Sequence, residues 1–166
     1  MEFTPVTLVF AIMTLFVLGG GLGVVISRNL FHAALYLVLA LFGISGLFIL
    51  LEAPFLAAVQ ILVYVGAISV LITITIMVTR RVMGVANAVN TQWPLSAVAA
   101  VLVLVTLGFV SINIFGGLSP VADVPPGSIE QIGASFANPL AFMLPFEVAS
   151  VLLLAALVGA IVVARE

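Results

Sequence analysis

The chain has 166 residues, of which 65% are hydrophobic and 6% are charged, and its formal net charge at pH 7 is -2. This composition cannot build the polar surface that a soluble domain of this length needs, so we interpret the chain as an integral membrane protein. The absence of cysteine excludes disulfides, thiol nucleophiles and thiolate-bound metals, and the absence of lysine leaves no basic patch for a nucleic acid.

Five apolar runs are long enough to cross a bilayer, which takes about 20 helical residues. The first opens with Glu2 rather than basic residues, so we expect a permanent helix and not a removable signal peptide. The sequence shows no soluble head and no internal repeat. We therefore predict one all-α membrane domain over residues 1–166, with transmembrane helices at about 4–26, 31–51, 54–79, 94–115 and 145–164.

The arginines predict the orientation of these helices. If every run crosses the bilayer, all four arginines fall on one side, and the acids that precede residue 131 fall on the other. The positive-inside rule makes the arginine side cytoplasmic. We therefore expect the N-terminus outside and the C-terminus in the cytoplasm. As the membrane we expect a bacterial plasma (inner) membrane rather than a thylakoid-type membrane. The arginines are Arg28, Arg80, Arg81 and Arg165, and the acids are Glu2, Glu52, Asp123 and Glu130.

The third run, residues 54–79, carries polar side chains within apolar sequence. An unpaired amide or hydroxyl in hydrocarbon costs on the order of a few kcal/mol, so these groups must face other helices or water. Gln60 and Tyr64 lie four residues apart, where they can share a hydrogen-bond network or bond separately to neighbouring helices. Gly66 weakens the helix at mid-membrane, because glycine is about 1 kcal/mol worse than alanine there. We expect a spanning helix that can change shape. The polar and glycine positions are Gln60, Tyr64, Gly66, Ser69, Thr73 and Thr75.

Three further titratable residues each allow two interpretations. His32 is either a hydrogen-bonded interface residue or a proton relay. Glu147 follows Pro145 at the start of the last run, where the helix dipole favours a carboxylate, or it serves a proton path or a partner contact. Glu52 is either a solvated loop acid or has such a role. None of these residues completes a catalytic or metal-binding constellation, so we expect no catalytic site and no cofactor in this chain.

Small residues in the first two runs predict close helix packing. They are Gly19, Gly20, Gly21, Gly23, Gly43 and Gly46. Such residues let helix backbones approach each other in lipid. Five helices with few polar anchors and many small residues predict one subunit of a larger assembly.

Three sequence blocks carry a resemblance to a known family. They are FHAALYLVLALFGISGLF at 31–48, EAPFLAAVQILVYVGAISVLI at 52–72 and PFEVASVLLLAALVGAIVVAR at 145–165. The chain resembles the NuoJ-type membrane subunit of respiratory complex I, whose counterparts are mitochondrial NADH dehydrogenase chain 6 and photosynthetic NdhG. The resemblance covers nearly the whole chain, and VYVGA at 63–67 is its most specific part.

The resemblance implies a membrane-arm subunit of a proton-translocating NAD(P)H or ferredoxin:quinone oxidoreductase of an electron-transport chain. It implies that the third helix contributes a gate, in which a π-bulge near Tyr64 and Gly66 interconverts with an α form and connects or disconnects a water wire. The gate residues would be Gln60, Tyr64, Val65 and Gly66, and Glu52, Thr75 and Glu147 would be candidates for a proton path or a partner contact. Ser69 and the tail ITITIMV depart from the bulky residues of many relatives.

The same resemblance implies partners and cofactors outside this chain. The partners would be the quinone-site subunit, the small K-type subunit, the antiporter-like subunits and the lipid bilayer, with no nucleic acid. Quinone, FMN and iron–sulfur clusters would belong to other subunits. The alternative is a structural small subunit of a cation/proton antiporter complex or a membrane-bound hydrogenase.

Helix geometry predicts what a conversion between the π and α forms of the third helix would change. At about 100° per residue, Ala67, Leu71 and Thr75 share a face with Gln60 and Tyr64 in an α-helix. One extra residue in a π turn replaces them with three aliphatic residues, Ile68, Ile72 and Ile76. The α form, which presents Thr75, is therefore expected to be the hydrated form.

Overall fold

The computed structural model describes residues 4–79, 92–117 and 126–165. Within these ranges every regular element is a helix, and five helices are long and apolar enough to cross a membrane. The five-helix all-α prediction is confirmed, and the predicted ends lie within two residues of the observed ones. The spanning helices cover Pro5–Ile26, Leu30–Leu50, Pro54–Thr79, Trp93–Ile114 and Met143–Ala164.

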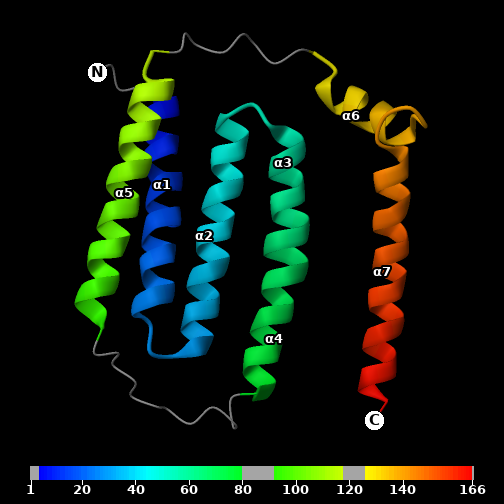
Figure 1. The fold of residues 1–166 in the computed structure, drawn as a ribbon, viewed down its shortest axis with the longest axis horizontal. Coiled ribbons are helices and arrows are strands. Elements are labelled where there is room, and N and C mark those ends of the chain that lie inside the picture. Colours follow the sequence, from blue (N-terminus) through cyan, green and yellow to red (C-terminus); the bar gives the residue numbers. More distant parts are fainter. Residues whose placement is uncertain (1–3, 80–91, 118–125, 166) are drawn as a thin grey trace.

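Helices α1 (Pro5–Ile26) and α2 (Leu30–Leu50) form a tightly packed hairpin (Figure 1). The connection between them is short, and Asn29 caps α2 with its Oδ1 atom, which accepts from the Phe31 N–H group over 3.0 Å. A Cβ atom on Gly20 would lie 2.8 Å from both the backbone nitrogen of Ala40 and the carbonyl oxygen of Tyr36. Glycine is thus required at position 20 for α1 and α2 to approach this closely.

The turn after α2 is a Schellman motif with Glu52 at the left-handed position. Glu52 has a φ of 54°, and its N–H group donates to the Ile49 carbonyl oxygen over 3.1 Å. The Ala53 N–H group donates to the Phe48 carbonyl oxygen over 2.9 Å, which completes the motif. Pro54 then starts the next helix at its first position, where a missing N–H group costs nothing.

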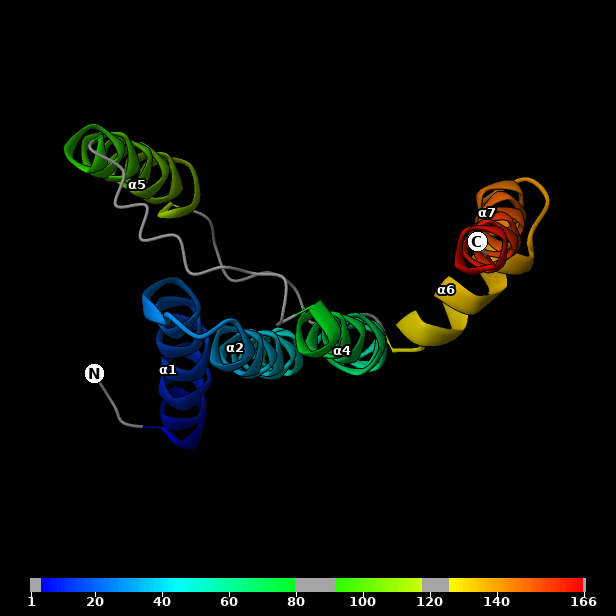
Figure 2. The ribbon, with the colours of Figure 1, turned by 90° about the horizontal axis from the view of Figure 1, so that it is seen from below.

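The third spanning helix has three parts: α3 (Pro54–Val59), the π-helical segment η1 (Gln60–Ile68) and α4 (Ser69–Thr79). It packs against α2, which lies between it and α1 in a row of three helices (Figures 1 and 2). This row holds every buried residue of the described part of the chain.

Helices α5 (Trp93–Phe115) and α7 (Met143–Ala164) stand apart from this row. Figure 1 draws α5 in front of α1, but Figure 2 shows that they are separated. None of the residues described in α5 and α7 is buried. Apart from the contact of α7 with the short helix that precedes it, both helices therefore offer their apolar surfaces to lipid or to other proteins.

A further helix, α6 (Ser128–Ala137), lies in the stretch that sequence reasoning left as a connection. The ring of Phe136 stacks on that of Phe146 in α7, with a centroid distance of 5.8 Å. The spacing of Ile129, Ile132 and Phe136 was the signal that could have predicted this helix, because it places them on one face.

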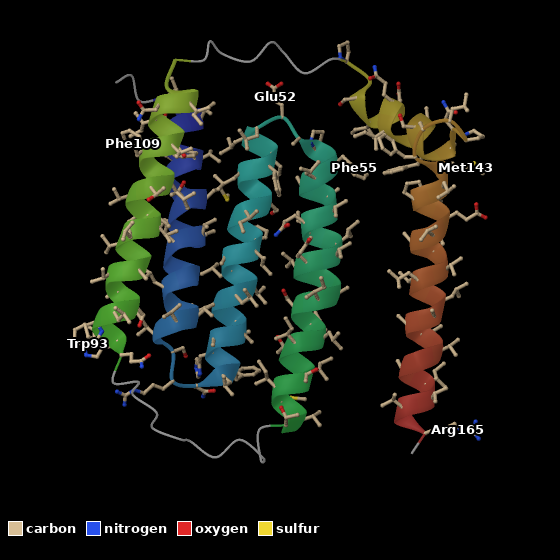
Figure 3. All side chains as sticks on the ribbon, in the orientation of Figure 1. Glu52, Phe55, Trp93, Phe109, Met143 and Arg165 are labelled. Carbon is tan, nitrogen blue, oxygen red and sulfur yellow. The ribbon has the colours of Figure 1, made fainter. Side chains whose placement is uncertain are left out.

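The first two helix connections lie at opposite ends of the molecule, as predicted for a chain in which every apolar run crosses the bilayer. The α1–α2 connection, which contains Arg28, lies at the same end of the molecule as Arg165, and Glu52 lies at the other end (Figure 3). Glu130, in α6, is also at the end of Glu52. Glu2, Arg80, Arg81 and Asp123, which also entered the prediction, lie outside the described residues.

Candidate functional site

The π-helical segment interrupts the third spanning helix near its middle. It extends over nine residues, Gln60–Ile68, and the Ser69 N–H group donates to the carbonyl oxygen of Tyr64, five residues earlier. The predicted π-bulge is therefore present, and it is longer than a single turn. Backbone angles at its borders, Val59 at φ -60° and Ser69 at φ -65°, are those of an ordinary helix, so the chain passes through the segment without a break.

A buried amide begins the segment. Gln60 is 7% exposed, and its Nε2 atom donates to the backbone carbonyl oxygen of Leu41 in α2 over 3.3 Å. This bond satisfies an amide that would be costly to leave unpaired between helices. It also ties the start of the π segment to α2.

A buried hydroxyl ends the segment. Ser69 is 2% exposed, and its Oγ atom donates to the carbonyl oxygen of Tyr64 over 2.7 Å. The same oxygen accepts from the Ser69 N–H group, so one residue supplies both bonds that close the π segment.

Downstream of the segment, the burial pattern matches only part of the predicted π arrangement, because Thr73 is partly buried as well as two of the three predicted isoleucines. Ile72 and Ile76 are partly buried, whereas Leu71 is 65% exposed and Thr75 is exposed. Ile68 departs from the prediction, because it is still 38% exposed. The Thr75 hydroxyl donates to the carbonyl oxygen of Leu71 in its own helix over 2.8 Å.

Of the other gate residues predicted by resemblance, Tyr64 and Gly66 are exposed, and Val65 is the most buried residue of the segment after Gln60. Tyr64 is 45% exposed, and Val65 is half-buried. The hydrogen-bond network considered for Gln60 and Tyr64 is not formed among the described residues, because the Gln60 amide turns to Leu41 instead. A Cβ atom on Gly66 would meet the Ile61 carbonyl oxygen, five residues earlier, at 3.3 Å. Gly66 thus relieves crowding within the π segment.

The structure does not gather the remaining candidates around this segment. Glu52 occupies the turn beyond α2, and Glu147 lies exposed in α7, which does not pack against the third helix. His32 stands at the opposite end, in the first turn of α2, where its ring meets that of Phe31 edge-on at 6.3 Å. Within residues 4–79, 92–117 and 126–165, no three His, Asp or Glu side chains are placed to hold a metal ion together.

Sequence reasoning missed two hydrogen-bonding groups in this site. The acceptor in α2 is the main-chain oxygen of Leu41, which no side-chain pattern can reveal. Ser69 was noted only as a polar residue and a departure from relatives. Its five-residue spacing from Tyr64 becomes informative once the helix is known to be π-helical, since side-chain hydroxyls in α-helices reach carbonyl oxygens three or four residues back.

The amino-acid sequence is similar to known proteins along most of its length. Residues 20–163 match the sequence model of a family described as NADH-ubiquinone/plastoquinone oxidoreductase chain 6. The chain is 38% identical to the F(420)H(2) dehydrogenase subunit J of Methanosarcina mazei, an alignment that covers 96% of this chain and 90% of the relative. It is 39% identical to the NAD(P)H-quinone oxidoreductase chain 6 of Synechocystis, covering 95% and 79% of the two chains. The chloroplast NAD(P)H-quinone oxidoreductase subunit 6 of Physcomitrium patens is 34% identical, with 96% and 84% covered.

Proposed function

We propose a function from one premise: the chain belongs to the family of NADH-ubiquinone/plastoquinone oxidoreductase chain 6. It is accordingly a multi-pass membrane subunit of a quinone oxidoreductase complex of the proton-translocating type. Its part in that complex, in our proposal, is a conformational gate formed by the third spanning helix. The observation that carries this proposal is the π segment Gln60–Ile68, held to α2 at one end and closed by Ser69 at the other.

The names of the relatives support a role that does not depend on the electron donor. One relative is a F(420)H(2) dehydrogenase subunit and the others are NAD(P)H-quinone oxidoreductase subunits, yet each aligns with more than nine-tenths of this chain. A subunit common to enzymes with different donors fits the membrane step better than the oxidation of the donor. These names also favour an oxidoreductase over the alternative of an antiporter or hydrogenase subunit.

The gate works by a change of helix register. In the π form Ile72 and Ile76 are partly buried, as is Thr73, whereas Leu71 and Thr75 are exposed. Removing the π segment rotates the downstream helix relative to the upstream part by about 100° for each extra residue that it holds. This rotation exchanges Ile72 and Ile76 for Leu71 and Thr75, and the Thr75 hydroxyl can hold a water molecule. The π form is then the dry, closed state and the α form the hydrated, proton-conducting state.

The surfaces left open indicate where partner subunits bind. The helices α5 and α7 have no buried residue among those described, and Leu62 at 72% and Tyr64 at 45% exposure leave one side of the π segment open. In our proposal these surfaces meet the quinone-site subunit, the small K-type subunit and the antiporter-like subunits. Quinone, FMN and iron–sulfur clusters are then held by other subunits, to which this chain contributes no ligand.

We further propose that the C-terminus and the arginine end of the helices face the cytoplasm of a bacterium. The placement of Arg28 and Arg165 at one end supports this orientation through the positive-inside rule. A reporter fused after Arg165 should be active only on the cytoplasmic side, and an externally active reporter would reverse the orientation.

The substitution Gly66→Leu in the intact complex tests the gate. A side chain at position 66 is tight against the Ile61 carbonyl oxygen in the π form, and leucine favours an α-helix over glycine by on the order of 1 kcal/mol. The variant should assemble with normal cofactor content but lose quinone reductase activity and proton pumping together. Near-normal turnover and pumping in a fully assembled variant would show that the π segment is only structural.

A further inference from the structure

We infer that Ser69 is a positioning residue that holds the third helix in its π form, acting as a clamp together with Gln60. This inference rests on the proposed gate, because it identifies what keeps that gate in one state. It concerns the stability of the π form itself, so it can be tested apart from proton pumping.

The first argument is the place of the two side chains on the helix. Gln60 and Ser69 are nine residues apart, and both are buried in the row of helices where α2 is the neighbour, at 7% and 2% exposure. In a regular α-helix nine residues turn through about 900°, which places the two side chains on opposite sides. Only the wider turns of the π segment let both face α2 at once. Conversion to the α form must therefore remove one of them from its buried position.

The second argument is the acceptor of the Ser69 hydroxyl. In the α-helical parts of the molecule, hydroxyl groups donate to carbonyl oxygens three or four residues back, as Ser45 does to Phe42 and Thr73 does to Ser69. Ser69 donates instead to Tyr64, five residues back. This hydrogen bond requires the π geometry. In the α form the hydroxyl would leave its buried position and donate three or four residues back, so a buried bond is exchanged for a more exposed and weaker one.

The third argument is that the two bonds of the clamp lie at the two borders of the same segment. Gln60 fixes the first residue of η1 to another helix, and Ser69 bonds the first residue of α4 back into η1. A helix held at both borders keeps its extra residue. Releasing the Ser69 hydroxyl should shift the balance between the two forms without unfolding either of them.

The substitution Ser69→Ala in the intact complex tests this inference, with the fraction of particles in each helix form counted by cryo-electron microscopy. Alanine removes the hydroxyl and adds no bulk. The ratio of α to π form should rise by up to about tenfold, the upper limit set by the net contribution of one hydrogen bond. Ser69→Thr, which keeps a hydroxyl at the same position, should restore the original ratio.

The chain offers a closely matched control in Ser45→Ala. Ser45 is also 2% exposed, and its Oγ atom also donates to a carbonyl oxygen over 2.7 Å, but within the regular α-helix α2. This variant should leave the ratio of the two forms unchanged. An unchanged ratio in Ser69→Ala, or an equal shift in Ser45→Ala, would overturn the clamp.

The two proposals fail in different ways. If Ser69→Ala raises the α fraction while proton pumping per quinone reduced stays normal, the clamp stands and the gate is refuted. If the helix form does not change, the clamp is refuted whatever the activity.

Discussion

The amide of Gln60 reaches across from the third helix to the carbonyl oxygen of Leu41 in α2, over 3.3 Å. Leu41 lies within a continuous α-helix, so its oxygen carries this bond in addition to its place in the helix. The interaction joins a segment that we expect to change form to one that remains regular. The start of the π segment is thus a fixed point about which the downstream part turns.

Replacing Gln60 with leucine should weaken this fixed point. Leucine fills a similar volume but cannot donate a hydrogen bond, so the contact between the two helices should lose about 0.5–1.5 kcal/mol. We expect a lower ratio of protons pumped to quinone reduced, measured in reconstituted vesicles. Thr106→Val, which removes an exposed hydroxyl that bonds only within α5, is the control and should keep the normal ratio. Equal ratios in both variants would show that the Gln60 bond has no part in coupling.

The close contact of α1 and α2 predicts a sharp difference between two adjacent glycines. A Cβ atom on Gly20 would lie 2.8 Å from backbone atoms of α2, whereas one on Gly21 would meet nothing within 4 Å. Gly20→Ala should therefore destabilise the hairpin by about 1–3 kcal/mol, as overpacking does. Gly21→Ala should keep the stability of the parent. Thermal unfolding of the purified complexes measures both, and equal melting temperatures for the two variants would contradict this packing.

Substitutions at Glu52 can distinguish a role in the backbone turn from a role in proton transfer. Because Glu52 has a φ of 54°, Glu52→Gly should relieve about 1 kcal/mol of backbone strain. We expect this variant to be slightly more stable and to pump normally, and Glu52→Gln to pump normally as well. A loss of pumping in both variants would instead assign the carboxylate to the proton path.

Much of the fold could be predicted from the sequence because the bilayer restricts the structures that an apolar segment can form. An apolar run of about 20 residues must form a helix that satisfies its own backbone, so the five spans could be located closely. The resemblance supplied the π-bulge near Tyr64 and Gly66. The length of the π segment and the acceptor at Leu41 could not be predicted, because both depend on main-chain atoms brought together by packing. Helix α6 was missed because its flanking glycines and prolines suggested a connection.

The isolated chain should be unstable, since the residues described in α5 and α7 bury nothing in this structure. Expressed alone and solubilised in detergent, it should aggregate or melt without cooperativity. The same chain within its complex should melt cooperatively. A monodisperse isolated chain with a sharp melting transition would argue against a subunit that depends on its neighbours.

The most direct measurement of the gate is the form of the third helix in the intact complex, compared between the resting enzyme and the enzyme during turnover. Cryo-electron microscopy can distinguish a π segment at Gln60–Ile68 from a continuous α-helix. We predict the π form at rest and a substantial fraction of α form during turnover, with Thr75 turned to the face of Gln60 and water beside it. A third helix that stays π-helical in every particle during turnover, while protons are pumped, would contradict the account.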